Sequence, residues 1–166
     1  MTVWDVGAHV GYHTLLMSKI VGPQGKVLSV EPSPRNIAFL RQHITLNRCT
    51  NVELMEAVIQ DRDGKVAFAS DGYRGYTGHV GSGAGDLMLP CLALDSLPGM
   101  PDVIKMDIEG AEALVLGAST RVLTTKPTLV VGVHGLAVGL SCRNILTQHK
   151  YEIQEPGVGD IFATSV

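Results

Sequence analysis

The sequence is poor in the residues that mark secreted and metal-rich proteins. Among its 166 residues there are three cysteines and one tryptophan. Cys49, Cys91 and Cys142 lie far apart and form no C-x-x-C pair. This pattern favours a reduced, cytoplasmic protein over a disulfide scaffold or a cysteine-based zinc site.

Long apolar runs, targeting signals and a strong charge of one sign are also absent. No stretch approaches the roughly 20 apolar residues that cross a bilayer, and the N-terminus has no basic region followed by an apolar run. A net charge of −3 gives no reason to expect nucleic acid or an anionic membrane surface as a partner. We therefore expect a cytoplasmic protein whose partners include neither nucleic acid nor membrane.

The remaining composition is that of a packed α/β domain. Hydrophobic residues make up 45% of the chain, too many for a disordered protein. The length predicts a single domain over residues 1–166, without repeats or an internal linker. Strand-like and helix-like segments alternate, which predicts a Rossmann-like, doubly wound and mostly parallel sheet with ligands at the carboxyl ends of its strands.

Periodicity and turn residues give the expected elements. Strands are expected at residues 2–6, 26–30, 52–58, 87–94, 102–107, 128–133, 151–153 and 161–163. Helices are expected at residues 12–21, 34–47 and 141–150, with another beginning near residue 112. Residues 65–68 are expected to form one arm of a hairpin. The glycine-rich segment 70–86 is expected to be a long loop, either a surface loop or a lid over substrate.

The turn after the first strand predicts a nucleotide-type pocket. Gly7 and Gly11 are four residues apart, and Glu31 ends the next strand. Glycine lets the backbone approach a ligand, and a carboxylate suits a ribose diol. His9 stands where a dinucleotide fingerprint has its middle glycine, so a pyrophosphate would be crowded. This disfavours an NAD-dependent oxidoreductase and favours S-adenosylmethionine, which has a ribose and no phosphates.

Polar residues also stand at the ends of two later strands. Lys105 and Asp107 are two residues apart and share a face of their strand. A lysine inside a parallel sheet needs a partner charge, which Asp107 or Glu109 can supply. The cluster is therefore either a structural ion pair or a polar group beside the reactive end of the cofactor. His134, at the end of the neighbouring strand, is the best candidate for a general base, and the alternative is a hydrogen-bonded structural histidine.

Two other polar residues, Glu112 and His13, have simpler interpretations. Glu112 is expected to cap and charge the first turn of its helix, and His13 to face outward or pack on the first helix. Asp107, Glu109 and His134 could form a divalent-metal triad, but only the carboxylate spacing supports it. No metal is expected.

Four segments resemble the FkbM-type S-adenosylmethionine-dependent methyltransferases. They are residues 5–14 (DVGAHVGYHT), 30–36 (VEPSPRN), 94–97 (LDSL) and 104–112 (IKMDIEGAE). The K-x-D-x-E-G-x-E run in the last segment is the most specific. The resemblance implies a seven-stranded methyltransferase fold whose last strand is antiparallel. It also implies O-methylation of a hydroxyl group, often on a sugar or natural product.

The same resemblance implies a set of site residues. It places Asp5, Gly7 and His9 around the methionine part of the cofactor, Glu31 on the ribose, and Asp107 near the sulfonium and the acceptor. The other implied cofactor residues are Ala8, Gly11, Thr14, Pro32, Asn36 and, near the adenine, Ala57 and Val58. The expected catalytic residues are Asp107, His134, Lys105 and Glu109.

The chain departs from the family pattern in two places. Family members usually carry a segment before the first strand, whereas this chain begins almost on the strand itself. The pocket is then open, closed by another subunit, or part of a truncated copy, and an uncovered first strand favours a homodimer. Gly132 stands where the family often has a glutamate. We expect methylation of a small hydroxylated acceptor; the alternative is a cofactor-binding module of the same fold that has lost turnover.

Overall fold

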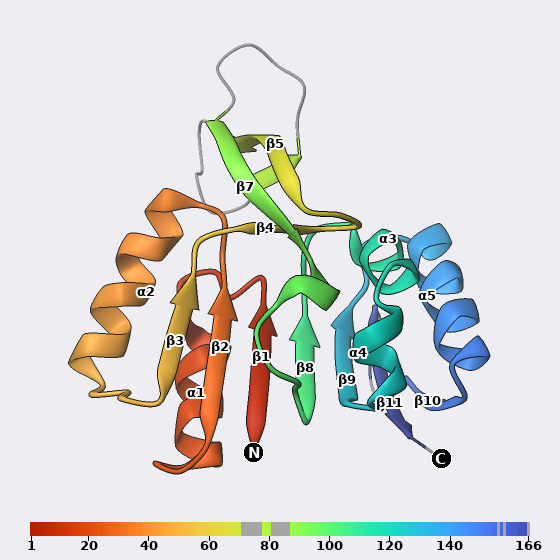
Figure 1. The fold of residues 1–166 in the computed structure, drawn as a ribbon, viewed down its shortest axis with the longest axis horizontal. Helices are drawn as coiled ribbons and strands as arrows, with labels where there is room; N and C mark the ends of the chain where they lie inside the picture. The colour runs from red at the N-terminus through yellow and green to blue at the C-terminus, as the bar shows by residue number, and fades with distance from the viewer. Residues whose placement is uncertain (71–77, 81–86, 156, 158, 166) are drawn as a thin grey trace.

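Parallel pairing of short apolar strands builds the main sheet of the protein. The computed structural model describes residues 1–70, 78–80, 87–155, 157 and 159–165. Its seven-stranded sheet has the order β10-β11-β9-β8-β1-β2-β3 (Figure 1). The strands are β1 (Thr2–Val6), β2 (Lys26–Val30), β3 (Val52–Met55), β8 (Val103–Met106), β9 (Thr128–Gly132), β10 (Tyr151–Gln154) and β11 (Asp160–Ser165). All neighbours are parallel except β11, which is antiparallel to both β9 and β10. The expected doubly wound sheet with an antiparallel last strand is confirmed.

The strand order makes the first turn a ligand site. Chain order runs outward from β1 through β2 to β3 on one side, and from β8 through β9 on the other. The direction in which the chain order runs across the sheet therefore reverses between β1 and β8. The connection after β1 leads toward one edge of the sheet, and the connection after β8 leads toward the other. Open α/β sheets bind ligands at such a switch point, outside the carboxyl ends of the strands.

The first strand lies in the middle of this sheet. It pairs with β2 on one side and β8 on the other. The uncovered first strand expected from the sequence is therefore wrong, because the free edges belong to β3 and β10. The homodimer itself stays a prediction.

Burial of large side chains on the central strands stabilises the sheet. Trp4 of β1 is the register partner of Ile104 on β8, which in turn faces Leu129 on β9. All three side chains are fully buried. Each contributes about 1.5–3 kcal/mol of hydrophobic free energy, which keeps the strand ends that carry the polar residues in a fixed register.

The helices largely follow the expected pattern. They are α1 (Tyr12–Val21), α2 (Pro34–Leu46), α3 (Glu112–Gly117), α4 (Thr120–Thr124) and α5 (Leu136–Gln148), with a short 3-10 turn at Leu94–Ser96. Ser33 caps α2 by accepting a hydrogen bond from the Asn36 amide at 3.5 Å, and Pro34 is its first residue. None of the helices within the described residues is long and apolar enough to cross a membrane.

Helix α5 begins five residues before its expected start. Gly139 looks like a helix breaker in the sequence, yet it is buried inside α5. A Cβ there would lie 3.2 Å from Cγ1 of Val133. Gly139 thus allows the helix to pack closely on the end of β9, and the sequence pattern misses this because the contact is tertiary.

A second sheet stands beyond the carboxyl ends of the main strands (Figure 1). Its order is β4-β7-β5-β6, built from β4 (Val58–Gln60), β7 (Leu87–Ala93), β5 (Gly64–Ser70) and β6 (Gly78–Val80). The expected single strand over residues 52–58 is wrong, since β3 ends at Met55 and the chain then crosses to the second sheet. No glycine or proline marks this crossing.

The second sheet also includes described residues of the segment 65–86, for which the sequence predicted a hairpin arm and a long loop. The expected hairpin arm is β5, which pairs antiparallel with β7 and β6. Within the expected loop 70–86, residues 78–80 form β6. Residues 71–77 and 81–86 lie outside the described residues, so the choice between surface loop and lid stays a prediction.

The end of β1 and the turn after it contact the ends of both neighbouring strands, β2 and β8, through backbone atoms. The amides of Gly7 and Ala8 donate to the Val30 carbonyl at 2.9 and 3.0 Å, and the Asp107 amide donates to the Val6 carbonyl at 3.0 Å. Gly7 has φ +80°, and a Cβ on it would lie 1.9 Å from the Asp107 carbonyl oxygen. Only glycine fits this close approach.

We predict that Gly7→Ala is more destabilising than Gly99→Ala. Gly99 has nearly the same φ, +78°, but a Cβ there meets no atom within 4 Å. Both variants carry the cost of a left-handed alanine, roughly 1–2 kcal/mol. The contact with Asp107 should add about 1–3 kcal/mol for Gly7→Ala, measured as the free energy of unfolding in urea. Equal losses would show that this approach is not tight.

Candidate active site

A pocket of about 710 Å³ opens at the switch point, at the carboxyl ends of β1, β2 and β8. This volume lies within the range of small-molecule sites. Most of the expected cofactor residues line it: Gly7, Ala8, His9, Glu31, Pro32, Asn36, Ala57, Val58 and Asp107. Two further expected residues, Lys105 and Glu109, also line it. The structure thus brings together, around one pocket, residues that are up to about 100 positions apart in the chain.

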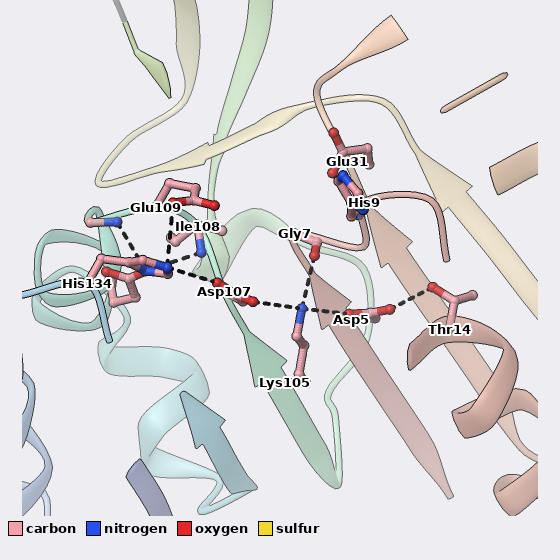
Figure 2. A network of polar contacts seen from close by, with 12 residues as sticks. Asp5, Gly7, His9, Thr14, Glu31, Lys105, Asp107, Ile108, Glu109 and His134 are labelled. Carbon is pink, nitrogen blue, oxygen red and sulfur yellow. Dashed lines mark hydrogen bonds and ion pairs between the residues drawn. The ribbon is translucent and has the colours of Figure 1, made fainter. Parts of the chain in front are cut away.

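At one end of the pocket, Glu31 is held by three N–H donors. Its Oε1 accepts hydrogen bonds from the Ser33 amide at 3.0 Å and from Asn36 Nδ2 at 3.1 Å. Its Oε2 accepts one from the His9 amide at 2.9 Å, and Figure 2 labels both residues at this end of the site. A carboxylate has about four lone-pair sites, so the fixed Glu31 keeps acceptor capacity for a hydroxyl group of a ligand.

His9 contributes to this end through its backbone. It has φ +52°, a conformation that is uncommon outside glycine. In this conformation its amide points at Glu31. An amide that carries a carboxylate partner is not available to a phosphate, and the negative charge beside it repels one. The geometry therefore agrees with the reading that His9 disfavours a pyrophosphate.

Three expected cofactor residues lie beneath the pocket rather than on its wall. Asp5 and Thr14 are fully buried, and Gly11 is buried against Leu40. Thr14 Oγ1 donates to Asp5 Oδ2 at 2.6 Å. Asp5, Gly11 and Thr14 therefore support the glycine turn from below, and their expected role toward the cofactor stays a prediction.

Lys105 joins the two halves of the site (Figure 2). Its Nζ donates to the Gly7 carbonyl at 2.9 Å and lies 3.5 Å from Asp5 Oδ1 and 3.8 Å from Asp107 Oδ2. The lysine is therefore paired, as expected. Its partners are Asp5 and Asp107, whereas Glu109, the other expected partner, faces His134.

At the other end of the pocket, Glu112 organises the loop after β8. Its side chain is fully buried, and its Oε1 accepts hydrogen bonds from the amides of Ile108 at 3.2 Å and Gly110 at 3.1 Å. Glu109 between them has φ +56°. Glu112 is the acidic residue of the first turn of α3, as expected, and its hydrogen bonds go to the loop that precedes the helix.

His134 lies behind this loop and contacts three carboxylates. Its Nδ1 is 3.0 Å from Glu112 Oε1, and its Nε2 is 3.5 Å from both Asp107 Oδ1 and Glu109 Oε2 (Figure 2). Partial burial lowers the pKa of His134, but the hydrogen bond to Glu112 and the charges of Glu109, Glu112 and Asp107 outweigh it and raise this pKa above its ordinary value. His134 is not among the residues that line the pocket, although Asp107 and Glu109 are.

The same cluster could bring ligand atoms to a cation. Asp107, Glu112 and His134 each offer one such atom, all within 4.8 Å of one another. Glu112 Oε1 already accepts two amide hydrogen bonds and faces His134 Nδ1. The arrangement is thus explained by hydrogen bonding alone, and metal independence stays a prediction.

Several lining residues were not anticipated. They are Tyr12, His13, Val30, Ile59, Gln60, Phe68, Ala111 and Leu114. His13 is exposed and packs on Tyr12 of α1, as expected, and it also borders the pocket. Ile108 and Gly110 line the pocket next to Asp107, at a strand end where the sequence predicts ligand contacts. Ala111 could have been found, since it lies inside the K-x-D-x-E-G-x-E run. Ile59, Gln60 and Phe68 could not, because only the second sheet brings them over the pocket.

Comparison with known sequences agrees with this site. The family described as Methyltransferase FkbM domain matches residues 5–153. The hexuronic acid methyltransferase AglP of Haloferax volcanii is 25% identical over 137 residues, 80% of this chain and 55% of that protein. A protein-L-isoaspartate O-methyltransferase of Methanothrix thermoacetophila is 38% identical over 55 residues, 33% of this chain and 26% of that protein. The chain spans about half the length, or less, of these curated relatives.

Solved structures share the fold. A methyltransferase FkbM from Methylobacillus flagellatus has a TM-score of 0.70 at 18% identity, covering 98% of this chain and 43% of that one. A precorrin-6y C5,15-methyltransferase from Geobacter metallireducens has a TM-score of 0.65 at 17% identity, covering 100% and 80%. An Aeropyrum pernix fibrillarin with natively bound S-adenosyl-L-methionine has a TM-score of 0.58 at 16% identity, covering 99% and 66%.

We predict that chelation of divalent metals leaves the protein unchanged. The buried carboxylate of Glu112 has hydrogen-bond donors of its own and needs no cation to offset its charge. The thermal unfolding midpoint should be the same with and without excess EDTA. A fall that added magnesium or manganese reverses would instead place a cation among Asp107, Glu112 and His134.

Proposed function

Because the chain belongs to the FkbM family of S-adenosylmethionine-dependent methyltransferases, we propose that it methylates a hydroxyl group of a small molecule such as a sugar. The observation that carries this proposal is the pocket with two different ends. At one end, three N–H donors fix Glu31, which would accept a hydrogen bond from a ribose hydroxyl. At the other end, Asp107 and Glu109 lie beside His134.

The residues present fit S-adenosylmethionine. Glu31 would accept hydrogen bonds from the ribose hydroxyls, and the buried apolar pair Ala57 and Val58 would contact the adenine. Gly7 and Asp107 would border the methionine part. When bound, the cofactor supplies a methyl group on a positively charged sulfur, which leaves with the electron pair of the carbon–sulfur bond.

The protein's own task is to align the acceptor and to take up its proton. Asp107 and Glu109 line the pocket with half-exposed carboxylates that accept hydrogen bonds from hydroxyl groups. His134 Nε2 lies 3.5 Å from each of them. An acceptor hydroxyl held by either carboxylate is thereby brought next to the imidazole, which we propose as the general base.

A polyhydroxylated acceptor suits this carboxylate-rich end. AglP of Haloferax volcanii is named for hexuronic acid, a sugar acid, which supports a sugar-like acceptor here. The three cysteines are free thiols, which supports a reducing, cytoplasmic setting. A cofactor-binding module without turnover is the competing function, and it predicts binding of the cofactor without methyl transfer to any acceptor.

The first test is ligand-dependent stability with a matched pair of variants. S-adenosylmethionine or S-adenosylhomocysteine at a hundred times its Kd should add about 2.7 kcal/mol, a rise of roughly 5–11 °C in Tm, while NAD should add nothing. Glu31→Gln should weaken S-adenosylhomocysteine binding in calorimetry by about tenfold or more, because a charged acceptor is lost. Glu53→Gln, at an exposed position of β3, is the control. Unchanged affinity in Glu31→Gln would remove Glu31 from the site.

We predict that Asp107→Asn reduces methyl transfer far more than stability. Asp107 is half-exposed and 3.8 Å from Lys105, so the loss of its charge should change the free energy of unfolding by about 1 kcal/mol or less. Formation of S-adenosylhomocysteine with a panel of monosaccharides and uronic acids should fall by about tenfold or more. Proportionate losses of activity and stability would favour a purely structural ion pair.

A further inference from the structure

Glu112 is a fully buried acidic residue whose contacts extend beyond the loop before α3. Its side chain has no exposed surface, and among the described residues its Oε2 has no hydrogen-bond partner. A buried carboxylate is costly unless charged or polar groups compensate it. The titratable partner that faces it is His134, through Oε1 and Nδ1 at 3.0 Å.

This contact sets the tautomer of the histidine. An ionised carboxylate can only accept hydrogen bonds, and the Nδ1–Glu112 contact of 3.0 Å is shorter than the 3.5 Å contacts of Nε2 with Asp107 and Glu109, so the single proton of the neutral ring belongs on Nδ1. Nδ1 of His134 is therefore the protonated nitrogen, and in the neutral ring Nε2 holds the lone pair. Nε2 is the nitrogen that faces Asp107 and Glu109, the two residues that line the pocket.

The same oxygen also sets the loop that carries these two carboxylates. Glu112 Oε1 accepts from the amides on either side of Glu109, at 3.2 Å from Ile108 and 3.1 Å from Gly110. Glu109 is thereby held in its left-handed conformation. One buried atom thus orients both the imidazole and the acceptor-facing loop.

We propose that Glu112 is a positioning residue for methyl transfer, which holds His134 with Nδ1 protonated and Nε2 directed at the acceptor. This proposal rests on the proposed function, in which His134 takes up the hydroxyl proton. Glu112 itself touches neither the pocket nor the reacting atoms, since it is fully buried and acts through His134.

The charges around the ring determine the expected pH dependence. Asp107, Glu109 and Glu112 all face His134, and together they raise its pKa. Glu112→Gln removes one of these charges, so the pKa of His134 should fall. The base is active when deprotonated, and the acidic limb of the kcat profile should therefore move to lower pH while the maximal rate falls.

The kinetic experiment is a double-mutant cycle with an exposed control. General base catalysis contributes roughly 10²–10⁴-fold, so His134→Gln should lower kcat by about a hundredfold or more, and Glu112→Gln by about tenfold or more. Glu112→Gln keeps an oxygen that can accept from the Ile108 and Gly110 amides, so the substitution acts chiefly on the ring, and the double variant should be no slower than His134→Gln alone. Affinity for S-adenosylhomocysteine should stay within about twofold. Glu152→Gln, at an exposed position of β10, is the control.

A spectroscopic measurement tests the orientation without any variant or turnover. In ¹⁵N-labelled wild-type protein above the pKa of His134, long-range proton–nitrogen correlation should show the proton on Nδ1. A proton on Nε2, or a Glu112→Gln protein in which His134 titrates unchanged, would overturn the proposal. Additive losses in the cycle would overturn it as well, since Glu112 would then act independently.

The two proposals fail in different ways. If His134→Gln transfers methyl groups as fast as the wild type, His134 is not the base, and the catalytic role of Glu112 falls with the proposed function. In that case the Nδ1 proton would still be observed. If the proton is on Nε2 while His134→Gln is inactive, the base stands and the positioning role of Glu112 is overturned.

Discussion

The site depends on a buried ammonium group between two strand ends. Lys105 reaches from β8 to the backbone of Gly7 and lies between the carboxylates of Asp5 and Asp107. Without this cation, Asp5 would be a fully buried negative charge that, within the described part of the chain, accepts a side-chain hydrogen bond from Thr14 alone. The ion pairs therefore hold the glycine turn, the start of α1 and the end of β8 as one unit. The positions of Gly7 and Asp107 on the pocket wall follow from that unit.

The pocket divides its chemistry between two carboxylate environments. Glu31 is surrounded by N–H donors and is fixed in place, which suits the binding of a neutral hydroxylated group. Asp107 and Glu109 are half-exposed and face an imidazole. The same residue type therefore stands in two different environments, and the difference arises from the partners of each carboxylate.

The second sheet gives this family fold its particular pocket. Ile59, Gln60 and Phe68 come from β4 and β5 and line the same pocket as the glycine turn. The sheet stands directly beyond the carboxyl edge of the main one (Figure 1). Acceptor selection by this domain would therefore be set by residues of the second sheet as well as by the strand ends.

The sequence by itself determined the main sheet, its helices and most of the cofactor wall. Apolar strands, the glycine turn and the acidic strand end are local signals, because a few neighbouring residues carry each one. The tertiary structure decided which residues face the ligand. Asp5 and Thr14 are buried beneath the pocket and hydrogen-bonded to each other, and Phe68 comes to the pocket from a second sheet. Glu112 is joined to His134 across 22 positions, and no local pattern encodes such a contact because it exists only when β8 and β9 lie side by side.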